Sequence, residues 1–73
     1  MTVLTTKSGS HYIISEKEGK TYLMNGLREY LVDSITYNIG EPLVATCRKL
    51  NTYTYEPSDE LTFIRSTPIV EIK

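Results

Sequence analysis

The sequence of 73 residues has one histidine, His11, one cysteine, Cys47, and no tryptophan. A single cysteine excludes an internal disulfide and a cysteine-rich zinc site. A catalytic His11 needs a nucleophile on its own side, but the adjacent Ser10 points to the opposite face of an extended strand. The carboxylates lie mostly in predicted loops, and their spacing does not resemble a calcium-binding loop. We therefore predict that the protein is not an enzyme and holds no metal and no cofactor.

Long apolar runs and an excess of one charge are also missing. No stretch approaches the ~20 apolar residues of a membrane-spanning helix, and the opening MTVLTTKSGS lacks the apolar segment of a signal peptide. Eight basic residues oppose nine acidic ones, so the formal net charge is −1. A dedicated nucleic-acid-binding protein usually carries a basic excess, because phosphate contacts supply most of its affinity. We expect a soluble cytoplasmic protein with no membrane partner.

The length of the chain is enough for one small domain, which we expect to span residues 1–73. A domain of this size buries a modest fraction of its surface and is marginally stable on its own. Small domains are usually reinforced by disulfides, by a metal or by self-association. Since the first two are not expected here, a homo-oligomer and a monomer both remain open.

The four glycines separate short stretches in which apolar and polar residues alternate. They are Gly9, Gly19, Gly26 and Gly40. Alternation with a period of two is typical of half-buried strands, and Asn25-Gly26 is a strong hairpin signal. The segment Leu27–Val32 fits either a strand or one helical turn, and we favour the strand. We expect no long helix.

Six or seven short strands at intervals of roughly 8–12 residues predict an all-β antiparallel barrel or sandwich. Eight alternating segments are the candidates for these strands: Thr2–Thr6, His11–Ser15, Thr21–Met24, Leu27–Val32, Ser34–Ile39, Leu43–Leu50, Leu61–Arg65 and Ile69–Ile72. A barrel of SH3-like or OB-like shape is favoured, because closure removes exposed strand edges. Pro68 marks a bend or an edge before the last segment, an edge suited to pairing with a second copy.

The same alternation predicts which side chains fill the core. Leu43, Ala45 and Cys47 share one face of their strand, and Cys47 is expected to be a buried core residue. The expected inward face of Ser34–Ile39 carries Ile35, Tyr37 and Ile39. Four of the six tyrosines are also assigned to the core: Tyr12, Tyr22, Tyr30 and Tyr37.

The candidate binding surface consists of Arg48, Tyr53, Tyr55 and Arg65. Tyr53 and Tyr55 share a face on a possible extension of the strand that contains Arg48. Tyrosines beside arginines suit ordinary sheet packing, a protein or self interface, and the stacking of single-stranded nucleic acid. We expect a binding protein whose partner is another protein or a second copy. The alternatives are a single-strand nucleic-acid binder and a binder of a nucleotide-like ligand at a subunit interface, although no phosphate-binding glycine motif is present.

Two motifs at the ends of the chain carry a resemblance. The segments Thr6–Tyr12 (TKSGSHY) and Arg65–Ile72 (RSTPIVEI) resemble the terminal signatures of small uncharacterised proteins encoded by phages of actinobacteria. The resemblance implies a phage accessory protein that works in a bacterial cytoplasm. It implies no catalytic or binding residue. Both motifs are also consistent with a tight first hairpin and a bent final strand.

Overall fold

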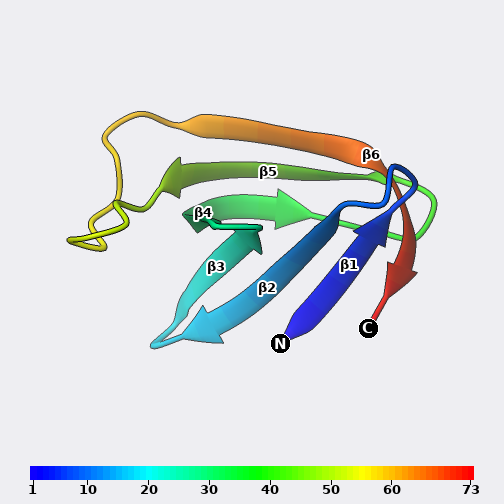
Figure 1. The fold of residues 1–73 in the computed structure, drawn as a ribbon, viewed down its shortest axis with the longest axis horizontal. Coiled ribbons are helices and arrows are strands. Elements are labelled where there is room, and N and C mark those ends of the chain that lie inside the picture. The colour runs from blue at the N-terminus through cyan, green and yellow to red at the C-terminus, as the bar shows by residue number, and fades with distance from the viewer.

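The computed structural model describes residues 1–73 and contains six strands and no helix. The strands are β1 (Thr2–Thr6), β2 (His11–Lys17), β3 (Lys20–Asn25), β4 (Arg28–Thr36), β5 (Pro42–Lys49) and β6 (Thr62–Ile72). Each pairs antiparallel with the next, and β6 pairs antiparallel with β1 to close a barrel (Figure 1). The all-β prediction and the preference for a barrel are confirmed.

Two-residue turns set the register of the hairpins on either side of β3. Between β2 and β3 the turn residues are Glu18 (φ 52°) and Gly19 (φ 77°), as a type I′ turn requires. Between β3 and β4, Gly26 takes φ 64° while Asn25 pairs with Arg28. A hairpin is thus present where Asn25-Gly26 predicted one, but its turn residues are Gly26 and Leu27, because Asn25 is the last residue of β3 and Leu27 lies outside β4. Glycine suits the positive φ at the first turn position because it has no Cβ.

The strand β4 replaces two strands expected from the sequence, Leu27–Val32 and Ser34–Ile39. It runs without a break from Arg28 to Thr36 and contains a bulge between Val32 and Ser34. The extra residue in a bulge reverses which face the following side chains point to. The sequence pattern of this one strand therefore resembles that of two separate strands. The expected inward position of Ile39 is wrong, since that residue lies outside the strand and is 59% exposed.

The core fills the inside of the barrel with side chains from all six strands. It consists of Leu4, Tyr12, Ile14, Leu23, Tyr30, Leu43, Ala45, Cys47 and Ile69. The inward face predicted for β5 is confirmed, because its three core members are at most 1% exposed. The tyrosine prediction holds for Tyr12, Tyr30 and the partly buried Tyr37. It is wrong for Tyr22, which stacks with a loop tyrosine and is not part of the core cluster.

Pro68 marks a corner of β6 and not the edge of the sheet. Before it, Thr62–Arg65 pair with β5, and after it Ile69–Ile72 pair with β1. Proline has no N–H to donate, but its carbonyl accepts the amide of Lys7 at 2.8 Å. The expectation of a terminal edge strand at Ile69–Ile72 is therefore wrong, because this half of β6 closes the barrel.

Candidate protein-interaction surface

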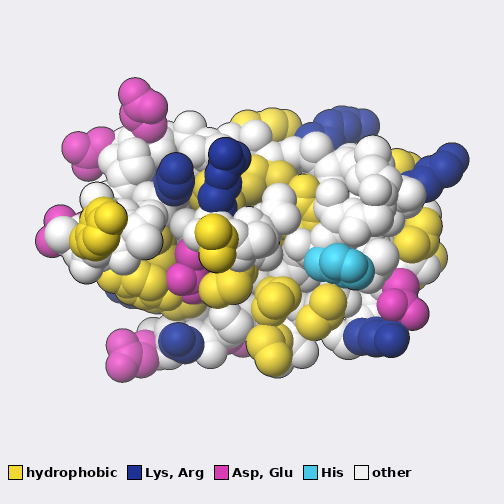
Figure 2. All heavy atoms as spheres, in the orientation of Figure 1, with side chains coloured by type: hydrophobic (Ala, Val, Ile, Leu, Met, Phe, Trp, Pro, Cys, Tyr) yellow, Lys and Arg dark blue, Asp and Glu magenta, His cyan; other side chains and the backbone are white.

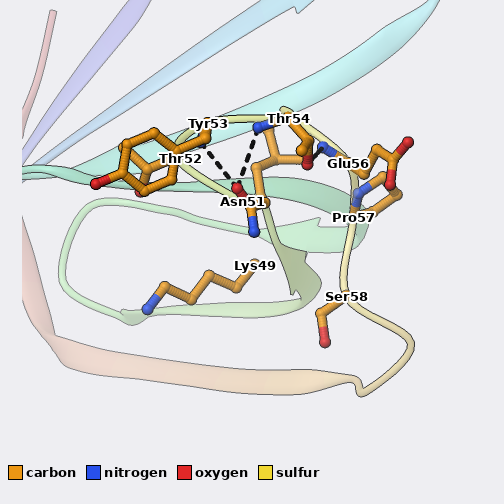
Figure 3. A pocket seen from close by; sticks show the side chains of 9 residues that line it. Lys49, Asn51, Thr52, Tyr53, Thr54, Glu56, Pro57 and Ser58 are labelled. Atoms are coloured by element: carbon orange, nitrogen blue, oxygen red, sulfur yellow. Dashed lines mark hydrogen bonds between the residues drawn. The ribbon is translucent and has the colours of Figure 1, made fainter.

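The longest connection in the barrel, residues 50–61 between β5 and β6, is exposed from Asn51 to Leu61 and extends from one end of the barrel (Figure 1). Asn51 shapes its first turn. The side-chain Oδ1 of Asn51 accepts the amides of Tyr53 at 2.8 Å and Thr54 at 3.1 Å (Figure 3). Asparagine favours this kind of turn because its side chain mimics a backbone acceptor. The strand extension expected for Tyr53 and Tyr55 is wrong, since both residues belong to this loop.

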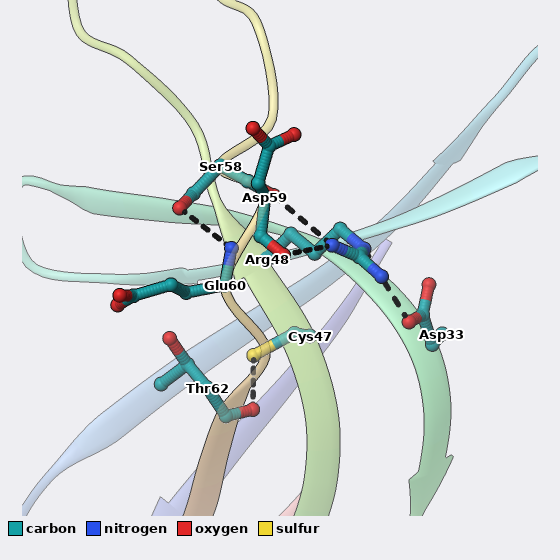
Figure 4. A network of polar contacts seen from close by, with 7 residues as sticks. All are labelled: Asp33, Cys47, Arg48, Ser58, Asp59, Glu60 and Thr62. Atoms are coloured by element: carbon teal, nitrogen blue, oxygen red, sulfur yellow. Dashed lines mark hydrogen bonds and ion pairs between the residues drawn. The ribbon is translucent and has the colours of Figure 1, made fainter.

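Arg48, the first candidate residue, fastens the loop to the barrel. Its Nη1 donates to the carbonyl oxygens of Ser58 at 3.2 Å and Asp59 at 2.8 Å. Its Nε lies 3.7 Å from Oδ2 of Asp33, at the bulge of β4 (Figure 4). Charge-assisted hydrogen bonds of this kind are stronger than neutral ones. The guanidinium therefore holds the far half of the loop in place, and the Arg48 side chain remains 32% exposed.

Tyr55 fastens the near half of the loop. Its ring stacks on that of Tyr22 with the centroids 6.3 Å apart, and its backbone takes φ 60°. A hydrogen bond with Glu29 raises the pKa of Tyr55 to about 12, with smaller contributions from burial and from the charge of Glu29. Positive φ is costly for a tyrosine, so the surrounding contacts must hold it there. Tyr55 is a structural clamp on the outer wall of β3 and β4.

The other two candidate residues remain available to a partner. Tyr53 is 95% exposed, and Arg65 projects from the outer wall of β6, opposite Val44. Arg65 and Arg48 do not lie opposite each other, because the cross-strand pair of Thr46 and Phe63 lies between them along β5 and β6. Arg48 and Tyr55 thus have side-chain contacts within the chain, although Tyr55 is still 49% exposed. The side chains of Tyr53 and Arg65 form no hydrogen bond or ion pair.

Phe63 and Leu61 are exposed residues that the sequence analysis did not single out. Phe63, the only phenylalanine, is 68% exposed, and Leu61 is 56% exposed. Both alternate with the half-buried Thr62 and Ile64, and they share the outer side of β6 with Arg65. The sequence could have indicated this exposure, because Arg65 alternates in phase with Leu61 and Phe63 and charged side chains are rarely buried without a partner.

An open hollow of about 510 Å³ lies beside the loop, lined by residues 49–54 and 56–58 (Figure 3). Its polar groups are the hydroxyls of the loop, the amine of Lys49 and the carboxylate of Glu56. No group of three or more histidine, cysteine or acidic side chains in the chain is arranged to hold a metal ion.

The two residues with potential nucleophilic or basic chemistry have structural partners. Cys47 is fully buried, and its Sγ donates to the carbonyl of Thr62 at 3.6 Å. Burial, and to a lesser extent the charge of Asp33, raises the pKa of this thiol. Nδ1 of His11 lies 3.2 Å from the hydroxyl of Thr5, its neighbour on β1. The thiol is therefore kept neutral, and the imidazole contacts no serine.

A second apolar area covers the outer wall of β1, β2 and β3. Val3 lies opposite Ile13, which lies opposite Met24 on its other side. Figure 2 shows hydrophobic side chains gathered over these strands, with lysine and arginine side chains dispersed around them. Val3 and Ile13 are half-buried and Met24 is 37% exposed, whereas Phe63 is 68% exposed. No helix is present that is long and apolar enough to cross a membrane.

Neither a protein-family model nor a curated protein nor a solved structure matches the chain.

Proposed function

We propose that the protein is a non-enzymatic β-barrel module that acts by binding a protein partner, either another protein or a second copy. The binding surface is the outer wall at the start of β6, formed by Leu61, Phe63 and Arg65, with Tyr53 in the adjoining loop. Aromatic and arginine side chains are enriched at the centres of protein interfaces.

The observation that carries this proposal is the exposure of Phe63. Because Phe63 is 68% exposed, its side chain contributes little hydrophobic free energy to folding. A small barrel has few large apolar side chains, so one that is left outside the core is unexpected. Burial of an aromatic ring in a partner recovers that stabilisation at the interface. The pinned loop and the ion pair of Arg48 keep the wall around Phe63 rigid, which lowers the ordering cost of binding.

The proposal is tested by affinity capture from a bacterial lysate, and by native mass spectrometry of the purified protein. We expect a captured partner, a homo-oligomer or both. Phe63→Ser should weaken each association at least tenfold, because truncated aromatic anchors typically cost 2 kcal/mol or more, which is roughly thirtyfold.

A matched control is Val70→Ser, which removes another exposed apolar side chain from β6, 55% exposed, at its β1-paired end. We expect this variant to bind like the wild type. Equal binding by the Phe63→Ser variant, or no association in either assay, would contradict the proposed function.

We also propose, from the terminal motifs, that the module is a phage accessory protein of a bacterial cytoplasm. The support is the resemblance of Thr6–Tyr12 and Arg65–Ile72 to such proteins. The test is the genomic neighbourhood of the coding sequence, where flanking phage structural or replication genes are expected. A location in a conserved chromosomal operon without phage genes would contradict this origin.

A further inference from the structure

The two halves of the strand β6 pair with different neighbours. From Ile69 to Ile72 it pairs with β1, whereas Thr62–Arg65 pair with β5 alone. Figure 1 shows β1 beside the red end of β6, and the orange first half of β6 extending along β5 toward the loop. The barrel is closed near the corner at Pro68, and the first half of β6 remains an edge strand.

The hydrogen bonds of β5 show which backbone groups of this edge face outward. The carbonyl of Lys49 accepts the amide of Ser58, and the amide of Leu43 donates to the hydroxyl of Ser66, so both groups point toward β6. Backbone groups alternate in direction along a strand. The odd-numbered residues of β5 therefore turn their backbone groups toward β6.

Thr62 and Ile64 lie opposite odd-numbered residues of β5 and take up the ladder bonds. The intervening Phe63 and Arg65 therefore turn their N–H and C=O groups away from β5, toward the side on which no strand lies. No hydrogen bond outside the strand ladders involves these two residues. Each presents an exposed donor and an exposed acceptor, the template that an added strand needs.

The charges along this edge are arranged with opposite signs at its two ends. Asp59 and Glu60 precede Leu61 and Phe63, and Arg65 follows them. All three charged side chains are exposed, and none forms an ion pair or a side-chain hydrogen bond within the chain. The segment is thus acidic, then apolar, then basic.

We propose that the segment that runs from the end of the loop into the first half of β6, Asp59–Arg65, pairs antiparallel with the same segment of a second copy to form a two-fold dimer. Strand addition at a sheet edge is a recurrent mode of protein recognition. This inference rests on the proposed function and names the partner as a second copy of the chain.

The charge order selects the second copy and its direction. In an antiparallel pair, the Asp59–Glu60 end of each copy lies beside Arg65 of the other, so acid meets base twice. A parallel pair would place acid beside acid and base beside base. Opposite charges across a strand pair are stabilising and like charges destabilising. The same segment of each copy is used once, so the assembly closes as a dimer and does not extend into a filament.

Charge reversal tests the proposal, with native mass spectrometry and sedimentation over a concentration series as the readouts. The wild type should form a dimer. Arg65→Glu alone, or Asp59→Arg with Glu60→Arg, should raise the dissociation constant about tenfold or more, because two attractive contacts become repulsive. Mixing the two variants should restore a heterodimer, since acid again meets base at both ends. A merely structural role of these side chains would not produce this rescue.

Lys7→Glu is the matched control, because it makes the same charge change at another exposed site, in the turn between β1 and β2. It should leave the dimer unchanged, and far-ultraviolet circular dichroism should show that all variants are folded. A strictly monomeric wild type, dimers unaffected by either reversal, or a mixture without heterodimer would overturn the inference. If the inference fails in this way, a lysate partner that is lost in the Phe63→Ser variant would still support the proposed function. Failure of the dimer is therefore distinguishable from failure of the proposed function.

Discussion

Ser8 and Thr67, 59 positions apart in the sequence, hold each other by two hydrogen bonds. The amide of Ser8 donates to Oγ1 of Thr67 at 3.2 Å, and the Thr67 hydroxyl donates to Oγ of Ser8 at 3.0 Å. They join the turn between β1 and β2 to the corner of β6 at Pro68, where the barrel closes. The two terminal motifs, Thr6–Tyr12 and Arg65–Ile72, are thus parts of one structural joint.

Removing the Thr67 hydroxyl should loosen this joint. Thr67→Val keeps the shape of the side chain but removes both hydrogen bonds, so the free energy of unfolding should fall by about 1–2 kcal/mol. Urea denaturation measures the change. Thr52→Val is the control, because Thr52 is an exposed loop residue whose hydroxyl has no partner in the chain. Equal losses in both variants would show that the joint does not contribute to stability.

The Tyr55 clamp should make stability depend on alkaline pH. Its pKa rises from the ordinary 10.0 to about 12 in the folded protein, chiefly through the hydrogen bond with Glu29. The unfolded chain therefore releases this proton first. The stabilisation is fully present below pH 10 and is lost as the pH rises from 10 toward 12.

Absorbance at 295 nm, which follows tyrosine ionisation, measures this shift. The wild type should retain one more protonated tyrosine near pH 11 than the Glu29→Gln variant, in which the charge that raises the pKa is removed. Tyr55→Phe should lose the late-titrating component altogether. A titration curve of the Glu29→Gln variant that is superimposable on that of the wild type would contradict the assigned contact.

The thiol of Cys47 should be unreactive in the folded state. Its thiol is fully buried and its pKa is raised above the ordinary 9.0, so both access and thiolate formation are suppressed. A thiol-specific reagent should react about a thousandfold more slowly with the native protein than with the urea-unfolded chain. Comparable rates in the two states would place Cys47 at the surface.

A substitution in the first two-residue turn should stabilise the protein. Glu18 adopts φ 52° immediately before Gly19, a conformation that asparagine tolerates better than glutamate. Glu18→Asn should therefore raise the free energy of unfolding by about 0.5–1 kcal/mol. Thermal denaturation followed by circular dichroism checks this, and an unchanged or lower midpoint would contradict the turn assignment.

The sequence predicted most of the barrel because period-two alternation is locally encoded. Leu43, Ala45 and Cys47 alternate without interruption, and their inward face was predicted correctly. The bulge at Asp33 was not predictable in this way, because an extra residue breaks the alternation and imitates a strand boundary.

The candidate surface was predicted only in part, because its arrangement depends on tertiary contacts. Arg48 and Tyr55 have the composition of a binding site, yet both hold the loop between β5 and β6. Their partners Asp33 and Tyr22 lie on β4 and β3, and no local pattern connects them. Phe63 was visible as an alternating residue, but its outward direction follows from the pairing of β6 with β5.

Amide hydrogen exchange measured by NMR shows whether the first half of β6 is an open edge. In dilute protein, Thr62 and Ile64 should be protected while the amides of Phe63 and Arg65 exchange at nearly unprotected rates. As the protein concentration rises and the dimer forms, Phe63 and Arg65 should gain protection. Amides of Phe63 and Arg65 that are as protected as their neighbours in dilute protein, or that stay unprotected in the dimer, would contradict the account.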